Sequence, residues 1–179
     1  MNRVDAKVRG AVFLFIAVIV SSCAGAITPQ SVAQSHAQRG ARATLETYFG
    51  CDTYEDSAYA QIATGARPWI LIAEEMLAQS DACYTEGIQA ALGQAMRNAP
   101  ATVLALVGKT PQLDAEYICL PFISAELPIA AQLVEIDRSR QAILSVDDGA
   151  VTKNKTACLA FIDGLSATLR AQMPASPER

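Results

Sequence analysis

Apolar side chains recur every three or four residues along most of this chain, which is the spacing of an amphipathic helix. The clearest stripe follows Pro68, because proline is favoured in the first turn of a helix; it comprises Trp69, Ile72, Ala73, Met76 and Leu77. A second stripe follows Ser80 and Asp81, either of which can cap a helix; it comprises Ile88, Ala91, Leu92, Ala95 and Met96. Since no long stretch alternates β-branched with polar residues, the pattern predicts an all-α fold.

Further helices are expected downstream, separated by loops that contain proline, glycine or aspartate. Pro100 can start a helix that Gly108 ends, and Asp114 can cap a short helix that Pro121 limits. A long helix is expected from Pro128, and the segment 147–155 separates it from a last helix that carries Cys158.

These patterns divide the chain into four parts. We expect a leader over 1–26, a polar tether and N-terminal helix over 27–50, a helical domain over 51–172 and a disordered tail over 173–179. The tether is predicted because residues 31–48 are polar and rich in alanine. Without the leader the chain has the usual size of one domain and can bury a core.

The leader has the build of an export signal, with a basic start, an apolar run over 11–20 and then two serines. The run is about half of the roughly 20 apolar residues that a membrane-spanning helix requires. The string Val20-Ser21-Ser22-Cys23 resembles the lipobox of bacterial lipoproteins, although Val and Ser replace the commoner Leu and Gly or Ala. The resemblance implies a lipid on Cys23, whereas ordinary signal-peptidase cleavage after Ala26 remains the alternative.

The cysteine count also points to export. Without Cys23 an even number remains in an exported chain, as a disulfide framework requires; these are Cys51, Cys83, Cys119 and Cys158. Four cysteines permit three pairings. We expect Cys51 with Cys83 and Cys119 with Cys158, because each pair would join neighbouring helical units.

An internal similarity supports a stacked arrangement of helices. The segments Cys119–Ile123 and Cys158–Ile162 agree at four of five positions. A period near 40 residues resembles HEAT-like repeats, whose helix pairs stack to bury a shared core. The resemblance implies a short, irregular helical stack, in which the second bridge requires its two helices to turn towards each other.

Charge and residue types argue against several functions. Without the leader the net charge is −6, which disfavours nucleic acid as a partner. The chain has one histidine, His36, in its polar N-terminal segment, so a Ser-His-Asp triad is not expected. No zinc motif is present and the cysteines are widely spaced, so we predict no metal, no cofactor and no catalytic residue.

Two kinds of candidate surface remain near Cys51. Asp52, Glu55 and Asp56 form an acidic cluster, while elsewhere in the chain Asp114 with Glu116 and Asp147 with Asp148 bracket loops. Paired carboxylates could serve a hydrolase, but at helix ends they more often cap amides. The same region is rich in aromatic residues, which either pack the first helices on the stack or form a partner-binding patch, since Tyr and Trp are enriched at protein interfaces. The candidate patch comprises Tyr48, Phe49, Asp52, Tyr54, Glu55, Asp56, Tyr59 and Trp69.

The sequence therefore predicts a non-catalytic protein of the bacterial cell envelope that binds another envelope protein. It would be periplasmic, or held at the outer membrane through a lipid on Cys23. An envelope hydrolase that uses the acidic cluster, and a periplasmic inhibitor or immunity protein, are the alternatives.

Overall fold

The computed structural model describes residues 26–51, 54–120 and 126–173. Within these ranges the chain is helical and has no strand, which confirms the predicted all-α class. The elements are α1 (Pro29–Tyr48), α2 (Ala58–Ala63), α3 (Arg67–Leu77), α4 (Ala82–Ala95), α5 (Pro100–Leu104), η1 (Pro111–Leu113), α6 (Ala115–Ile118), α7 (Ile129–Leu144), η2 (Gly149–Val151) and α8 (Thr152–Ala171).

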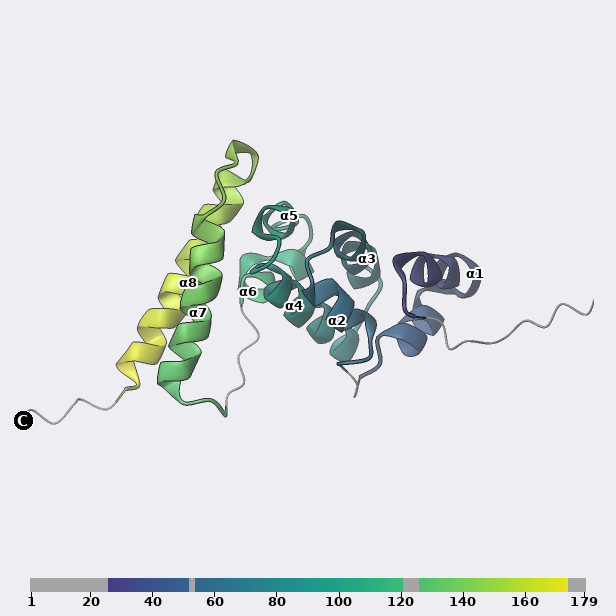
Figure 1. The fold of residues 1–179 in the computed structure, drawn as a ribbon, viewed down its shortest axis with the longest axis horizontal. Helices are drawn as coiled ribbons and strands as arrows, with labels where there is room; N and C mark the ends of the chain where they lie inside the picture. The colour runs from purple at the N-terminus through teal and green to yellow at the C-terminus, as the bar shows by residue number, and fades with distance from the viewer. Residues whose placement is uncertain (1–25, 52–53, 121–125, 174–179) are drawn as a thin grey trace, which may run out of the picture.

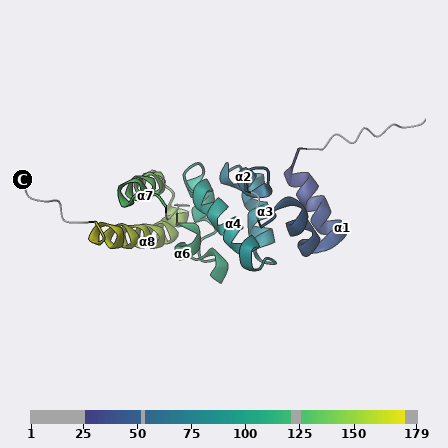
Figure 2. The same cartoon turned by 90° about the horizontal axis from the view of Figure 1, so that it is seen from below.

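The helices are arranged in a stack that runs from α1 at one end to the α7–α8 pair at the other (Figure 1). The same order is visible when the molecule is turned by 90° (Figure 2). Each unit packs on its neighbours: α1 on α3, α2 and α3 on α4, α4 on α6, and α6 on α8. This arrangement confirms the predicted short, irregular helical stack.

The core consists of the stripes that the apolar pattern predicted. All five stripe residues of α3 are buried, and so are the five that begin with Ile88 in α4. Helix α5 ends at Leu104, earlier than the predicted Gly108, but Leu106 and Val107 remain buried beyond it. The turn closes at Gly108, whose φ of 77° suits glycine and whose N–H donates to the Leu113 carbonyl at 3.0 Å.

The predicted tether is wrong for the residues from Pro29 onward, because they form α1. Thr28 caps this helix, and its side chain and that of Ser31 each accept a hydrogen bond from the other's backbone N–H. Gly40, with φ 82°, divides the helix into two segments, and the buried hydroxyls of Ser35 and Thr44 pair at 3.0 Å across this kink. Few apolar residues suffice here because α1 lies on α3.

Both predicted cysteine pairs lie at bonding distance. Cys51 is joined to Cys83 with a Cα–Cα distance of 5.6 Å, and Cys119 to Cys158 with 5.4 Å. The second bridge joins the end of α6 to the middle of α8, two helices that pack directly on each other. The two cysteines that begin the similar segments therefore occupy different positions in their helices.

Several predictions fall on parts of the chain that the structure does not describe. They are the leader with Cys23, Asp52, the predicted helix limit at Pro121, and the tail beyond Met173. In the described ranges, none of the helices combines the length and the apolar character needed to cross a membrane.

Candidate functional site

The aromatic residues of the predicted binding patch form part of the core. Phe49, Tyr59 and Trp69 are 0%, 3% and 6% exposed, and Tyr48 and Tyr54 are partly buried against the same cluster. Phe49, Tyr59 and Trp69 therefore belong to the core and offer almost no surface to a partner, whereas Tyr48 and Tyr54 keep part of theirs. The aromatic side chains close to Cys51 in the sequence therefore pack against the helical stack.

Tyr59 is the centre of this packing. Its ring lies 5.3 Å from that of Phe49 in an edge-to-face arrangement and is stacked 5.6 Å from that of Tyr54. Its hydroxyl donates to the Gly50 carbonyl at 3.1 Å, which holds the residue before Cys51 in place. Burial raises the pKa of Tyr54 to about 12 and also raises the pKa of Tyr59.

The described acidic residues near Cys51 are arranged as surface groups. Glu55 and Asp56 are both exposed, in the turn that precedes α2. A general acid of a hydrolase needs burial to keep its proton near neutral pH, and these two side chains do not have it. The geometry therefore gives the hydrolase alternative no support.

His36 joins two helices. Its Nδ1 lies 2.8 Å from Oε1 of Glu75, and its Nε2 contacts the side-chain amide of Gln79. Because Glu75 is on α3 and Gln79 lies in the turn just after it, the imidazole fastens α1 to the end of α3. In the part of the chain that the structure describes, no three His, Cys, Asp or Glu side chains are grouped so that they could hold a metal ion.

A cleft of about 530 Å³ lies between α8 and the segment that runs from the end of α5 to α6. We name it the α6–α8 cleft. It is lined by Val107, Gly108, Asp114, Ala115, Glu116, Lys153, Asn154, Ala157 and Phe161.

The walls of the α6–α8 cleft are fixed to each other at two points. The Cys119–Cys158 bridge joins the end of α6 to α8, and both cysteines are fully buried. Near the start of α8, the Asn154 side chain donates to the Leu104 carbonyl at 2.8 Å, which ties α8 to the end of α5. The two walls of the cleft are therefore held in a fixed relation by one covalent and one hydrogen-bonded contact.

The cleft combines apolar and charged groups. Val107, Ala157 and Phe161 supply apolar surface, whereas Asp114 and Glu116 are exposed carboxylates on the α6 side. Lys153 supplies an ammonium group from the first turn of α8. Such a surface can accept an apolar side chain and a basic side chain from the same ligand.

The sequence did not identify this site. Asp114 and Glu116 are recognisable as carboxylates that bracket a loop, but Lys153 and Phe161 come from a helix some 40 residues later. The similarity between the segments that begin at Cys119 and Cys158 was the available signal, because those cysteines bring α6 and α8 together.

Comparison with protein-family models, with curated proteins and with solved structures found no match to this chain.

Proposed function

We propose that this protein is exported to the bacterial cell envelope and acts there without catalysis, by binding a segment of another envelope protein in the α6–α8 cleft. The observation that carries the proposal is the cleft itself, whose walls are held by the Cys119–Cys158 bridge. A rigid cleft reduces the ordering cost of binding, since its side chains need not rearrange.

The chemistry of the cleft indicates what the partner segment presents. An apolar side chain would lie against Phe161 and Val107, and an Arg or Lys would face Asp114 and Glu116. A carboxylate or a backbone carbonyl of the same segment would be within the reach of Lys153. The partner is thus expected to offer a short basic and apolar stretch.

Export is supported by two features of the chain. Two cysteine pairs lie at bonding distance in the structure, and disulfides persist in oxidising compartments. The leader has the build of a signal, and Cys23 follows a lipobox-like string. A lipid on Cys23 would place the helical stack at the membrane surface.

A substitution in the cleft tests this function. Ala157 is exposed on α8 and lines the cleft, so Ala157→Trp fills it without removing a buried group. Ala167 is also exposed on α8 but lies about 15 Å further along the helix, outside the cleft. Ala167→Trp is therefore the matched control.

The measurement is crosslinking in the native envelope, followed by purification of the tagged full chain. The wild type and Ala167→Trp should recover the same dominant partner, and Ala157→Trp at least about tenfold less of it, a loss of about 1.4 kcal/mol. Equal helical circular dichroism shows that the variants fold. Undiminished recovery with Ala157→Trp would refute the cleft as the binding site.

A further inference from the structure

The two bridges differ in their access to solvent. Cys119 and Cys158 are both 0% exposed, so their sulfur atoms are enclosed by the core. Cys51 is exposed and Cys83 is partly buried. Because thiol–disulfide exchange begins with a thiolate that reaches one sulfur of the bridge, the Cys51–Cys83 bridge is the open one of the two.

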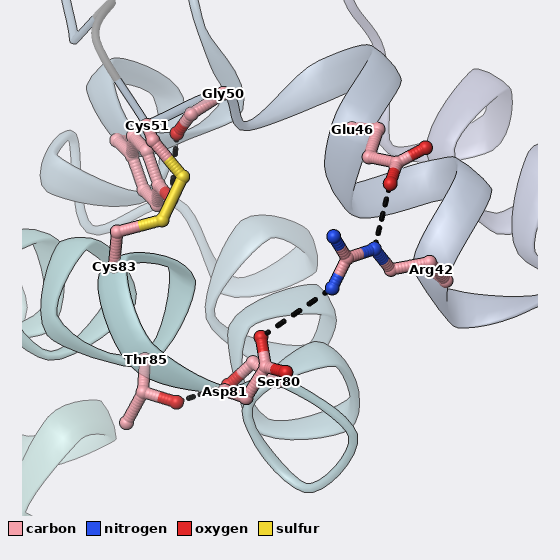
Figure 3. The surroundings of a disulfide bond; sticks show 9 residues. Arg42, Glu46, Gly50, Cys51, Ser80, Asp81, Cys83 and Thr85 are labelled. Carbon is pink, nitrogen blue, oxygen red and sulfur yellow. Dashed lines mark hydrogen bonds and ion pairs between the residues drawn. A yellow bond between two sulfur atoms is a disulfide. The ribbon is translucent and has the colours of Figure 1, made fainter.

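The two sulfur atoms of the open bridge also differ from each other. Cys51 lies in an irregular segment beyond α1, whereas Cys83 is the second residue of α4, a helix of 14 residues. The backbone N–H groups of a first helical turn have no partner within the helix, and they stabilise a thiolate. Cys83 is therefore the better leaving group, and Cys51 is the more accessible point of attack. Figure 3 shows the bridge between the two residues.

Charged groups around the start of α4 affect how well a thiolate on Cys83 is stabilised. Asp81, at the cap position, opposes a negative charge on Cys83, but Nη1 of Arg42 lies 3.7 Å from its carboxylate and offsets it. Arg42 also pairs with Glu46 at 2.6 Å and lies 5.7 Å over the Tyr84 ring. Glu86 follows on the next turn of α4.

The surroundings of the open bridge do not depend on it for their packing. Tyr59 holds the Gly50 carbonyl by its own hydrogen bond, and α2 packs directly on α4. Ser80 and Thr85 pair at 2.8 Å across the start of α4 (Figure 3). Opening the bridge would thus free Cys51 while the stack keeps its core.

We propose that the Cys51–Cys83 bridge is a thiol-exchange site, at which an external thiolate attacks the Cys51 sulfur and Cys83 leaves as a thiolate. The bond between the two cysteine sulfurs breaks, and a bond between Cys51 and the incoming sulfur forms. The electron pair of the broken bond ends on the Cys83 sulfur, so this step is an exchange without net oxidation. If the reagent is a dithiol, its second thiolate attacks the mixed disulfide, which releases the oxidised reagent and reduced Cys51.

The Cys51–Cys83 bridge is proposed as a site of chemical modification, and this proposal is independent of the function proposed for the α6–α8 cleft. Its reagents are small thiols, which would remain attached to Cys51, and dithiols, which would reduce the bridge. The Cys119–Cys158 bridge, which holds the cleft, would stay closed under the same conditions.

The test treats the folded full-length protein with excess glutathione, stops the exchange with acid and maps the peptides. We expect glutathione on Cys51, a free thiol at Cys83, and an intact Cys119–Cys158 bridge that opens at least about tenfold more slowly. In denaturant both bridges should open at similar rates. Attachment mainly at Cys83, or equal opening of both bridges in the folded protein, would overturn the proposal.

Two double variants provide a check that does not depend on peptide mapping. Cys119→Ala with Cys158→Ala keeps the open bridge, and Cys51→Ala with Cys83→Ala keeps the buried one. The first variant should react with glutathione while its helical circular dichroism is unchanged, and the second should resist. If either variant fails to fold, the map of the wild-type protein still decides the outcome.

Discussion

At the scale of single residues, the position of Tyr59 depends on a glycine in the neighbouring helix. A Cβ atom at Gly87 of α4 would lie 2.5 Å from Cζ of Tyr59. The ring cannot retreat easily, because Phe49 and Tyr54 pack against it and its hydroxyl is bonded to Gly50. Gly87 therefore sets how closely α2 and α4 approach each other.

Gly87→Ala is expected to lower the free energy of unfolding by about 1–3 kcal/mol, as overpacking of a core does. Gly164 is the matched control, because it lies within α8 and a Cβ there would meet nothing within 4 Å. Gly164→Ala should raise the free energy of unfolding by about 0.5–1 kcal/mol. Urea unfolding measures both changes, and a stabilising Gly87→Ala would contradict the described packing.

The buried tyrosines make stability depend on alkaline pH. The pKa of Tyr54 is raised from its ordinary value near 10 to about 12 by burial, so between these values the unfolded chain loses a proton that the folded chain keeps. Stability from this group is complete below pH 10 and falls as the pH rises towards 12. Tyr54→Phe should flatten the dependence in urea unfolding between pH 9 and about 11.5. If the free energy of unfolding falls just as steeply in Tyr54→Phe, groups other than Tyr54 cause the pH dependence.

At the scale of elements, the sequence predicted the helices whose apolar stripes are dense. The stripes of α3 and α4 have apolar residues every three or four positions, and burial of one face follows from that spacing. The helix expected within 27–50 begins earlier than the predicted tether allowed, because its buried aliphatic residues Val32 and Leu45 are sparse and it packs on α3. The sequence left the burial of Phe49 and Tyr59 open, since residue type does not show which side of a loop faces the core. The α6–α8 cleft forms because α6 and α8 lie side by side, and no local sequence pattern predicts that two such distant segments meet.

Arg97, directly after α4, attaches helix α7 to the stack. Its guanidinium donates to the Glu135 carboxylate at 2.7 Å, to the buried Ser139 hydroxyl at 3.1 Å and to the Glu135 carbonyl at 3.3 Å. Arg97 and Glu135 are 27% and 24% exposed in their side chains, so solvent screens them less than a surface pair.

Arg97→Ala is expected to lower the free energy of unfolding by about 2 kcal/mol, because it removes charged hydrogen bonds and leaves a buried hydroxyl without its donor. The matched control is Arg140→Ala, which breaks the more exposed Arg140–Asp163 pair between α7 and α8. That change should have little effect, as is usual for surface ion pairs. Chemical denaturation compares the two, and equal losses would show that Arg97 has no special part in the attachment.

At the scale of the whole molecule, the two covalent bridges add stability to a stack whose helices already pack on their neighbours. Each helical unit contacts its neighbours, so few contacts connect distant parts of the chain. The bridges close separations of 32 and 39 residues, for which the chain-entropy model gives about 4 kcal/mol each. Since a domain has a net stability of about 5–15 kcal/mol, the oxidised cysteines provide a large share of it.

The most direct test is a disulfide map of the protein isolated from its own cells, with free thiols blocked at lysis. We expect two linked peptides, Cys51 with Cys83 and Cys119 with Cys158, on a chain from which the leader has been removed. An intact leader together with four blocked, unpaired thiols would contradict both export and the two bridges, because the chain would then reside in a reducing compartment.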